Sequence, residues 1–459
     1  MTRVSAHSFR QLRPSSSSRI LDKFALLPIL ACAFSIILTP LMNFYAADHT
    51  LRSTPDPGLS NRLFWPAMTA VSLILAAANY SRLSKLTFPT HIRWLFAYLA
   101  LAGASVLWAF KPEFSFVRFL QQVMVLTSII LPAMLATRTA DLIRGMFICF
   151  AIAATMNIFF VLDPKPPNPK VFEPEGYVGY FEGKNYLGEF AALAFLLALH
   201  EAFCSGFRRA LGIVFTVIAA VLMLLANSKT AIGLSVVAPS LAAVTLFIRK
   251  KTRISVAILL LSIPFGYKVL NITTGYNTNR LSYMLYGDST LTGRTTIWDF
   301  ADSEIARRPL LGWGYQSFWL VGPDAPSVVE APGWVKRMPN AHNGYKDTML
   351  ETGQVGLILL LAFILTTLHA IGRMADRDPA RAWVVLSIAI YIIIHNFLES
   401  LWMRGYEFIW VTFVILAADT ARYCQHVPQQ RVANASSSTK SAGPGASRVA
   451  RRHRGRVPI

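Results

Sequence analysis

An ionisable histidine precedes a long apolar run in the last third of the chain. His342 lies in the segment Asn340-Ala-His-Asn-Gly-Tyr-Lys, and Gly353 follows at a distance that suits a short helix. We predict that His342 occupies the first turn of that helix, where the helix dipole disfavours the imidazolium form. A neutral imidazole can accept a proton from an attacking hydroxyl group. A purely structural role in capping or packing is the alternative for a single histidine.

Cations flank several other apolar runs and would suit an anionic substrate. Arg294 falls in the first turn of a helical pattern that ends at Pro309, where a positive charge opposes the helix dipole. Either an anionic partner or an interfacial, snorkelling arginine explains this position. Lys184 precedes one apolar run, and Lys229 lies in a very short turn between two others.

Together these residues predict a site for a phosphate-bearing lipid. The expected catalytic residues are His342 and Arg294, and the expected substrate-binding residues are Lys184, Asn185, Lys229, Arg280 and Asn343. The cations would hold a pyrophosphate and neutralise the charge that grows as it leaves. The carboxylates Glu182 and Glu351 are expected nearby, because they are close in sequence.

A second histidine lies near the end of another apolar run. His395 and Asn396 are followed one helical turn later by Glu399. An ionisable side chain inside a membrane span is a functional candidate, although a hydrogen bond between packed helices explains it equally.

The elements that must position these residues are membrane-spanning helices. The chain has 459 residues, of which 54% are hydrophobic and 15% charged, and its mean hydropathy is +0.44. This composition indicates an all-α polytopic membrane protein rather than a soluble enzyme. The apolar runs predict about twelve transmembrane helices, at roughly 25–46, 63–80, 93–110, 119–137, 143–162, 187–204, 210–227, 230–248, 254–271, 354–373, 381–398 and 405–421.

The distribution of Lys and Arg predicts the orientation. Basic residues concentrate in the loops of one parity and in both terminal segments, so the positive-inside rule places both termini in the cytoplasm. The predicted organisation is a basic arm at 1–24, nine helices in 25–271 with an outer loop at 163–186, a large, partly helical outer loop at 272–353, three helices in 354–421 and a disordered basic tail at 422–459.

Other functional classes find little support. The formal net charge is +20, but much of it lies in the loops and the tail, which suits anionic lipid head groups better than nucleic acid. None of the four cysteines suggests a disulfide framework or a metal site, and we expect no metal and no cofactor. The chain contains no nucleotide-binding glycine loop and no HExxH sequence.

Four segments resemble the O-antigen ligase and polymerase superfamily, the Wzy and WaaL type membrane proteins. They are Phe-Glu-Gly-Lys-Asn-Tyr-Leu-Gly at 181–188, Ser-Lys-Thr-Ala at 228–231, the stretch from Gly-Arg-Thr-Thr-Ile-Trp to Arg-Pro-Leu-Leu-Gly-Trp-Gly at 293–314, and Ala-His-Asn-Gly-Tyr with the later Gly353 and Gly356. The twelve-span layout agrees with the resemblance, which covers nearly the whole chain. Within the superfamily the chain most resembles the exopolysaccharide repeat-unit polymerases.

The resemblance implies a GT-C-like enzyme of the bacterial inner membrane. Such proteins transfer sugar chains from undecaprenyl pyrophosphate to a sugar hydroxyl on the periplasmic face, without metal. Arg294 would correspond to the arginine that contacts the pyrophosphate, and His342 to the essential histidine. Lys229 replaces the usual arginine of its motif, which keeps the charge but loses bidentate phosphate geometry.

Two alternatives to a polymerase of exopolysaccharide repeat units stay open. A ligase would transfer a finished chain to lipid A core, and the motifs hardly separate the two activities. A transporter or flippase would place its polar residues near the midplane of the membrane, whereas here they lie mainly in the outer loops. Expected partners are the lipid-linked oligosaccharide, membrane lipids, a chain-length regulator and export proteins, but no nucleic acid.

Overall fold

The computed structural model describes residues 23–45, 58–137, 140–163, 172–173, 176–274 and 293–425. Over these residues the protein is almost entirely helical, with one short antiparallel pair of strands, β1 (Phe172–Glu173) and β2 (Gly176–Tyr177). The predicted all-α polytopic fold is therefore confirmed. Arg280, nearly all of the predicted basic arm and most of the predicted tail lie outside the described residues.

The helices follow the predicted apolar runs closely. Those before the strands are α1 (Leu26–Ala33), the π-helical turn η1 (Phe34–Leu38), α2 (Thr39–Tyr45), α3 (Leu59–Ala77), α4 (Tyr80–Leu83), α5 (Thr90–Ala104), the 3₁₀ turn η2 (Ser105–Leu107), α6 (Pro112–Leu135) and α7 (Leu142–Leu162). Those after the strands are α8 (Lys184–Ala202), α9 (Phe207–Leu225), α10 (Lys229–Thr252), α11 (Val256–Thr274), α13 (Arg294–Arg307), α14 (Pro326–Val329), the 3₁₀ turn η4 (Gly333–Arg337), α15 (Gly344–Met374), α16 (Pro379–His395) and α17 (Phe408–Gln425).

Each of the twelve predicted spans coincides with a described helical segment. Eight of these segments are long and apolar enough to cross a membrane: α1 through α2, α5 with η2, α6, α7, α9, α10, α11 and α15. The others are α16, which is apolar but shorter, and α3, α8 and α17. The count of twelve membrane crossings stays a prediction.

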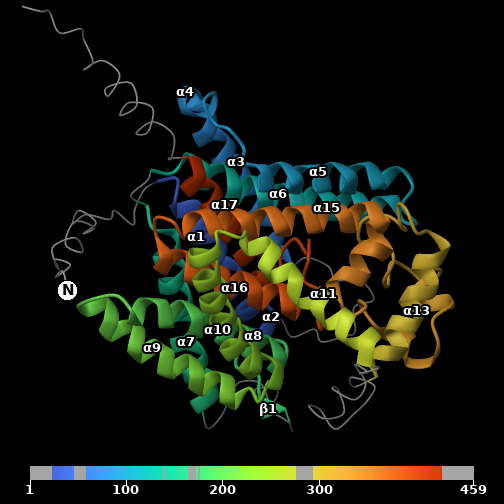
Figure 1. The fold of residues 1–459 in the computed structure, drawn as a ribbon. Helices are drawn as coiled ribbons and strands as arrows, with labels where there is room; N and C mark the ends of the chain where they lie inside the picture. Colours follow the sequence, from blue (N-terminus) through green and yellow to red (C-terminus); the bar gives the residue numbers. More distant parts are fainter. Residues whose placement is uncertain are drawn as a thin grey trace, which may run out of the picture.

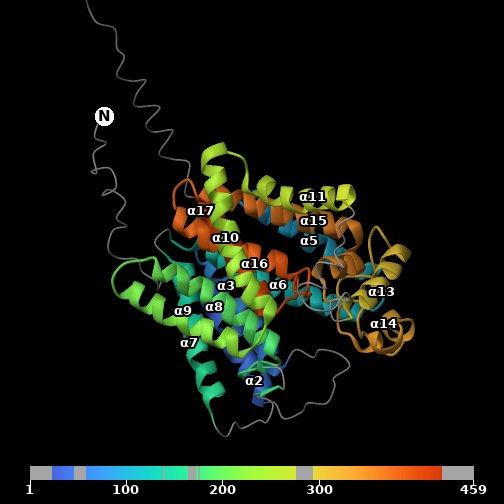
Figure 2. The same ribbon diagram turned by 60° about the horizontal axis from the view of Figure 1, so that its bottom comes forward.

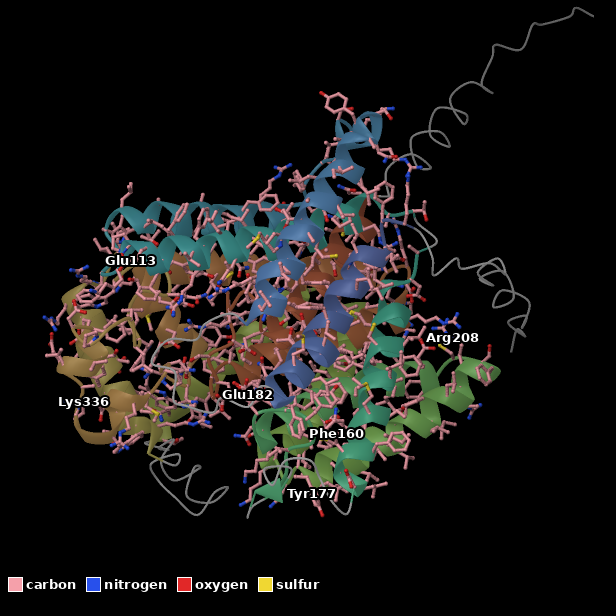
Figure 3. The ribbon with its side chains drawn as sticks, turned by 180° about the vertical axis from the view of Figure 1, so that it is seen from behind. Glu113, Phe160, Tyr177, Glu182, Arg208 and Lys336 are labelled. Atoms are coloured by element: carbon pink, nitrogen blue, oxygen red, sulfur yellow. The ribbon has the colours of Figure 1, made fainter. Side chains whose placement is uncertain are left out.

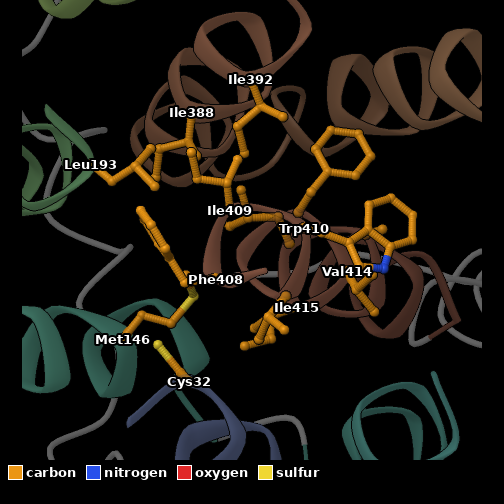
Figure 4. Packing of buried hydrophobic residues seen from close by; sticks show 14 of the residues in the cluster. Cys32, Met146, Leu193, Ile388, Ile392, Phe408, Ile409, Trp410, Val414 and Ile415 are labelled. Carbon is orange, nitrogen blue, oxygen red and sulfur yellow. The ribbon is translucent and has the colours of Figure 1, made fainter. Parts of the chain in front are cut away.

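The centre of the bundle is built from α8, α16 and α17. Every residue of α17 from Phe408 to Arg422 is buried, and α16 is buried on all sides over most of its length. Figure 4 shows why: Leu193 of α8, Ile388 of α16 and Phe408 of α17 meet in one apolar cluster, although they are far apart in sequence. A helix that is apolar all round belongs in the middle of a bundle.

A separate layer covers one end of the bundle. In Figure 1 the segment from α13 to the start of α15 lies at one end of α5, α6 and α15, and Figure 2 shows α13 and α14 at that same end. Figure 3 places Glu113, at the start of α6, and Lys336 of this layer at one end, and Arg208 at the other. We call the end with Lys336 the capped end.

The capping layer has its own small core. Ile297, Phe300 and Ala301 of α13 are buried, and they pack mainly within the layer. Their neighbours include Trp313, Phe318 and Trp319, which are also buried. The aromatic rings of these three residues stabilise the layer.

The layer is joined to the bundle where α15 breaks. Gly353 has φ +67° and ψ −166°, and a Cβ atom there would lie 2.1 Å from the carbonyl oxygen of Leu310. The loop before α15 provides hydrogen-bond partners for the backbone groups at the break. Gln354 N–H donates to the carbonyl oxygen of Pro309, and Trp313 N–H donates to the carbonyl oxygen of Leu350. Irregular backbone at membrane depth is tolerated when protein surrounds it in this way. The predicted helix stop at Gly353 is therefore a break within a longer helix.

Candidate active site

His342 lies just before α15 rather than in its first turn. The helix begins at Gly344, and its N-cap is Asn343, whose side chain accepts hydrogen bonds from the N–H groups of Tyr345 and Lys346. His342 itself has φ +47°, a left-handed conformation that is uncommon for a residue with a side chain. The predicted helical position is wrong because Asn343, not Asn340, caps the helix. Because His342 lies outside the helix, the helix dipole gives no reason to expect a neutral imidazole.

Both neighbours of His342 are held firmly. Ala341 donates its N–H to Asp347, at 3.2 Å from each carboxylate oxygen, and its carbonyl accepts from Trp298 Nε1 at 3.0 Å. On the other side, Asn343 N–H donates to Ser400 Oγ at 3.0 Å. These contacts fix the chain on both sides of His342, so its strained backbone is supported by the fold.

The turn after α16 lies directly against this segment. Gly344 N–H donates to the carbonyl oxygens of Asn396 and Glu399, at 2.8 and 3.0 Å. A Cβ atom at Gly344 would lie 2.4 Å from Asn396 Oδ1, so only glycine fits between the two segments. The structure thus brings together the two histidine-containing motifs at 340–345 and 395–400, which are far apart in sequence.

Arg294 and His342 meet at a carboxylate that sequence analysis had not assigned to the site. His342 Nδ1 lies 3.0 Å from one oxygen of Glu399, and Arg294 Nη2 lies 2.8 Å from the other. Arg294 also donates to the carbonyl oxygen of Leu398. We call Arg294, Glu399 and His342 the outer triad. The sequence signal for Glu399 was a carboxylate at the end of a predicted span, where an ion-pair partner is usual.

The electrostatics of the outer triad favour an ionised Glu399. Burial opposes the carboxylate, but the hydrogen bond from His342 and the charge of Arg294 outweigh burial and hold the pKa of Glu399 below its ordinary value. The three side chains are still partly open to solvent: 18% of Arg294, 19% of Glu399 and 29% of His342 is exposed. A substrate can therefore reach them.

The predicted lysines begin two neighbouring helices. Lys184 is the first residue of α8, and the exposed Lys229 is the first residue of α10. The first turns of these helices touch, because a Cβ atom at Gly188 would lie 2.5 Å from Ser228 Cβ. Asn185 is exposed beside Lys184. Two cations and two helix N-termini thus lie in one region, which favours anions.

A buried pair connects this region to the outer triad. Glu189 of α8 lies 2.9 Å from His395 Nε2 at the end of α16, and both side chains are almost entirely buried. The backbone N–H of Glu399 donates to the carbonyl oxygen of His395 at 3.0 Å. The contact between Glu189 and His395 therefore links α8, which begins at Lys184, to Glu399.

The two carboxylates expected beside His342 have other partners. Glu182 accepts a hydrogen bond from Asn43 Nδ2 at 3.0 Å, and Glu351 lies 3.0 Å from Arg404. Arg404 also binds Asp347 at 3.0 Å, so this second cluster holds α15 to the turn before α17. Closeness in sequence misled the prediction, because Glu351 lies two helical turns beyond the cap at Asn343.

One cysteine has neighbours that sequence spacing did not reveal. Potential ligand atoms of His200, Glu201 and Cys204 lie within 4.8 Å of one another at the end of α8. Glu201 is already bound by Arg208 through Nε at 2.6 Å and also through Nη2. The expectation that no cysteine forms a metal site stays a prediction, since Arg208 already occupies the carboxylate of this cluster.

Comparisons with known proteins agree with the resemblance seen in the sequence. The O-antigen ligase family matches residues 214–361, a stretch that includes Arg294 and His342. The exopolysaccharide production protein ExoQ of Rhizobium meliloti is 26% identical over 325 residues, which cover 67% of this chain and 72% of that protein. Two proteins provisionally named polysaccharide ligases, from Rickettsia felis and Rickettsia conorii, are each 28% identical over 102 residues, or 22% of this chain and 25% of theirs.

The helical bundle, the capping layer and these matches lead to one classification. The chain is a multi-pass membrane protein, its residues 214–361 match the O-antigen ligase family, and it is similar to an exopolysaccharide production protein.

Proposed function

We propose that the protein is a metal-independent glycosyltransferase that polymerises exopolysaccharide repeat units on the periplasmic face of the bacterial inner membrane. The donor would be an oligosaccharide linked to undecaprenyl pyrophosphate, and the acceptor a sugar hydroxyl of a second lipid-linked unit. The observation that carries the proposal is the outer triad, in which a partly exposed histidine and an arginine share one carboxylate. The proposal places the capped end in the periplasm and, as the distribution of Lys and Arg predicts, both termini in the cytoplasm.

The geometry gives each member of the outer triad a role in the transfer. Glu399 accepts a hydrogen bond from His342 Nδ1–H, which fixes the ring and leaves Nε2 as the proton acceptor. His342 Nε2 then takes the proton of the attacking hydroxyl while its oxygen bonds to the anomeric carbon of the donor sugar. The bond from that carbon to the phosphate oxygen breaks, and its electron pair leaves with the lipid pyrophosphate.

The cations serve the leaving group in this proposal. Arg294 has five N–H donors, of which the contacts to Glu399 and Leu398 use only some. Its remaining donors, with Lys184 and Lys229, would neutralise the charge on the pyrophosphate as the bond breaks. Asn343, whose side chain is committed to the cap of α15, would act on the loop rather than on the substrate.

The test is transfer by purified protein in liposomes supplied with a synthetic lipid-linked repeat unit alone. We expect a ladder of products from the wild type and none from His342→Ala. His369→Ala is the matched control, because this histidine lies further along α15, where it contacts Ser255. A ladder that persists in His342→Ala would contradict the proposal.

The same assay separates the polymerase from the ligase. The match to the O-antigen ligase family favours the ligase as the second candidate. Products that form only after a lipid A core acceptor is added would identify a ligase. Sugar-dependent transport without transfer would replace both with a transporter.

A further inference from the structure

Glu189 and His395 form a buried acid–base pair that the proposed transfer does not use. Glu189 Oε1 and His395 Nε2 are 2.9 Å apart, and each side chain is only 4% exposed. The opposite atom of each group, Glu189 Oε2 and His395 Nδ1, has no hydrogen-bond partner among the described residues. A buried polar atom without a hydrogen-bond partner costs free energy, so its presence calls for an explanation.

A third unsatisfied group lies in the same place. Tyr391, one turn before His395 on α16, stacks on the imidazole at 5.5 Å between ring centroids. Its hydroxyl is buried and has no partner in the described part of the chain, and it interacts electrostatically with Glu189. Three polar groups with unused hydrogen-bonding capacity thus surround one point between α8 and α16.

Charged groups at the outer ends of several helices act on this pair. Glu189 interacts electrostatically with Glu399 and Arg294 of the outer triad, and Glu399 also interacts with His395. Among the described residues, the groups that interact directly with the pair are Tyr186, Tyr391, Glu399, Arg294 and Glu407. His342 is bound to Glu399, and Glu182 and Arg404 act through Glu407. Carboxylates thus outnumber the arginines in this set.

A lipid pyrophosphate adds further negative charge to such a region. In a site of low dielectric constant, an anion that arrives beside Glu399 and Glu189 raises the proton affinity of nearby groups. A coupled Glu–His pair responds as a unit, because one added proton makes the net charge of the pair more positive by one. The unpartnered atoms Glu189 Oε2 and His395 Nδ1 offer places for that proton.

We propose that Glu189 and His395 are positioning residues that take up one proton from solvent when a pyrophosphate-bearing lipid binds at the outer triad. The inference rests on the proposed function, since it assumes that this lipid binds there. The added proton offsets the anion and keeps Glu399 paired with Arg294 and His342. Donor binding is therefore tighter at lower pH.

Calorimetric titration of the full chain in nanodiscs with undecaprenyl pyrophosphate tests this coupling. Measurements in two buffers with different ionisation enthalpies give the number of protons taken up on binding. We expect Glu189→Gln to take up roughly one proton fewer than the wild type. Glu201→Gln is the matched control, because it breaks a buried carboxylate–cation pair at the other end of the same helix and should leave the proton count unchanged.

The outcomes separate this inference from the proposed function. If the lipid binds with the same proton count in the wild type, Glu189→Gln and His395→Gln, the inference is overturned while the proposed function stands. A uniform loss of affinity at all pH values with an unchanged proton count would show a merely structural role and would also overturn it. If the wild type does not bind the lipid at any pH, the proposed function fails first. Should Glu189→Gln not fold, the pH dependence of wild-type affinity decides, since an affinity that does not change with pH contradicts proton uptake.

Discussion

Two charged clusters lie at opposite ends of α16 and differ in what surrounds them. At its start, Arg381 binds Asp419 through Nη2 at 2.8 Å, and Arg422 binds the same carboxylate at 2.6 Å. Asp419 is completely buried, and the cluster joins α16 to α17. At the other end of α16, the turn that follows carries Glu399 of the outer triad. We call the first group the inner cluster.

The difference between the two clusters distinguishes a charged group that stabilises the fold from one that can react with a substrate. In the inner cluster the carboxylate has no exposed surface and is held by two guanidinium groups, so it can stabilise the fold but cannot meet a substrate. In the outer triad all three side chains keep some exposed surface, and the histidine has a strained backbone. Strain and access together favour a reactive role, because strain persists only where the fold supports it.

The largest effect should come from removing the outer histidine. We expect His342→Ala to lower the transfer rate by about 10²–10⁴-fold, the usual contribution of a positioned acid–base group. Its melting temperature should stay close to that of the wild type, since the side chain is partly exposed. Initial rates in liposomes and thermal unfolding in detergent measure the two quantities. A large fall in stability with little loss of rate would reverse the comparison.

Removing the inner carboxylate should act on stability instead. Asp419→Ala removes the buried carboxylate that Arg381 and Arg422 share, and breaking a buried ion pair costs about 3–5 kcal/mol. The rate per folded molecule should not change. The control is Asp376→Ala, because the carboxylate of Asp376 is exposed where it binds Arg249. This variant should lower the free energy of unfolding by less than about 1 kcal/mol. Equal effects of the two variants on unfolding would contradict the assignment.

The acid side of the stability profile should depend on Glu399. Its pKa is below the ordinary value of 4.5, so its ionised form stabilises the fold above that value, and this contribution is lost as the pH falls through the lowered pKa. Thermal unfolding between neutral and acid pH should show a smaller loss of stability for Glu399→Gln than for the wild type. Parallel profiles for the two proteins would mean that Glu399 is not stabilised by Arg294 and His342.

The smallest effect should come from the exposed lysine at the start of α10. We expect Lys229→Ala to raise KM for the charged donor by an amount worth about 1 kcal/mol or less, because an exposed cation is well screened. The rate at saturating donor should hardly change. Lys250→Ala is matched to it, since this lysine is exposed near the other end of α10. A similar rise in KM for both variants would point to general charge rather than to a site at Lys229.

Sequence periodicity predicted the helices well. Apolar runs long enough to span a membrane reappear as helices at all twelve places, and the break at Gly353 follows from a residue type that tolerates positive φ. The capping layer was predicted as a partly helical loop, but its own small core was not predicted. Periodicity shows which side of α13 is buried and cannot show what covers it.

The site was predicted only in part for a similar reason. Residue type and spacing selected Arg294 and His342, which the structure brings to one carboxylate. The carboxylate itself is Glu399, which lies far along the chain from both, so the expected neighbours were the wrong acids. Pairings of this kind depend on tertiary packing, here on the contact between Gly344 and Asn396.

His342 and Glu399 act as one unit in the proposed transfer. The direct test is the initial transfer rate of the double variant His342→Ala with Glu399→Gln, beside each single variant. If Glu399 works only through His342, the double variant is no slower than His342→Ala alone, because residues that act as a unit are not additive. A double variant whose loss equals the product of the two single losses would show that the residues act independently and would contradict the account.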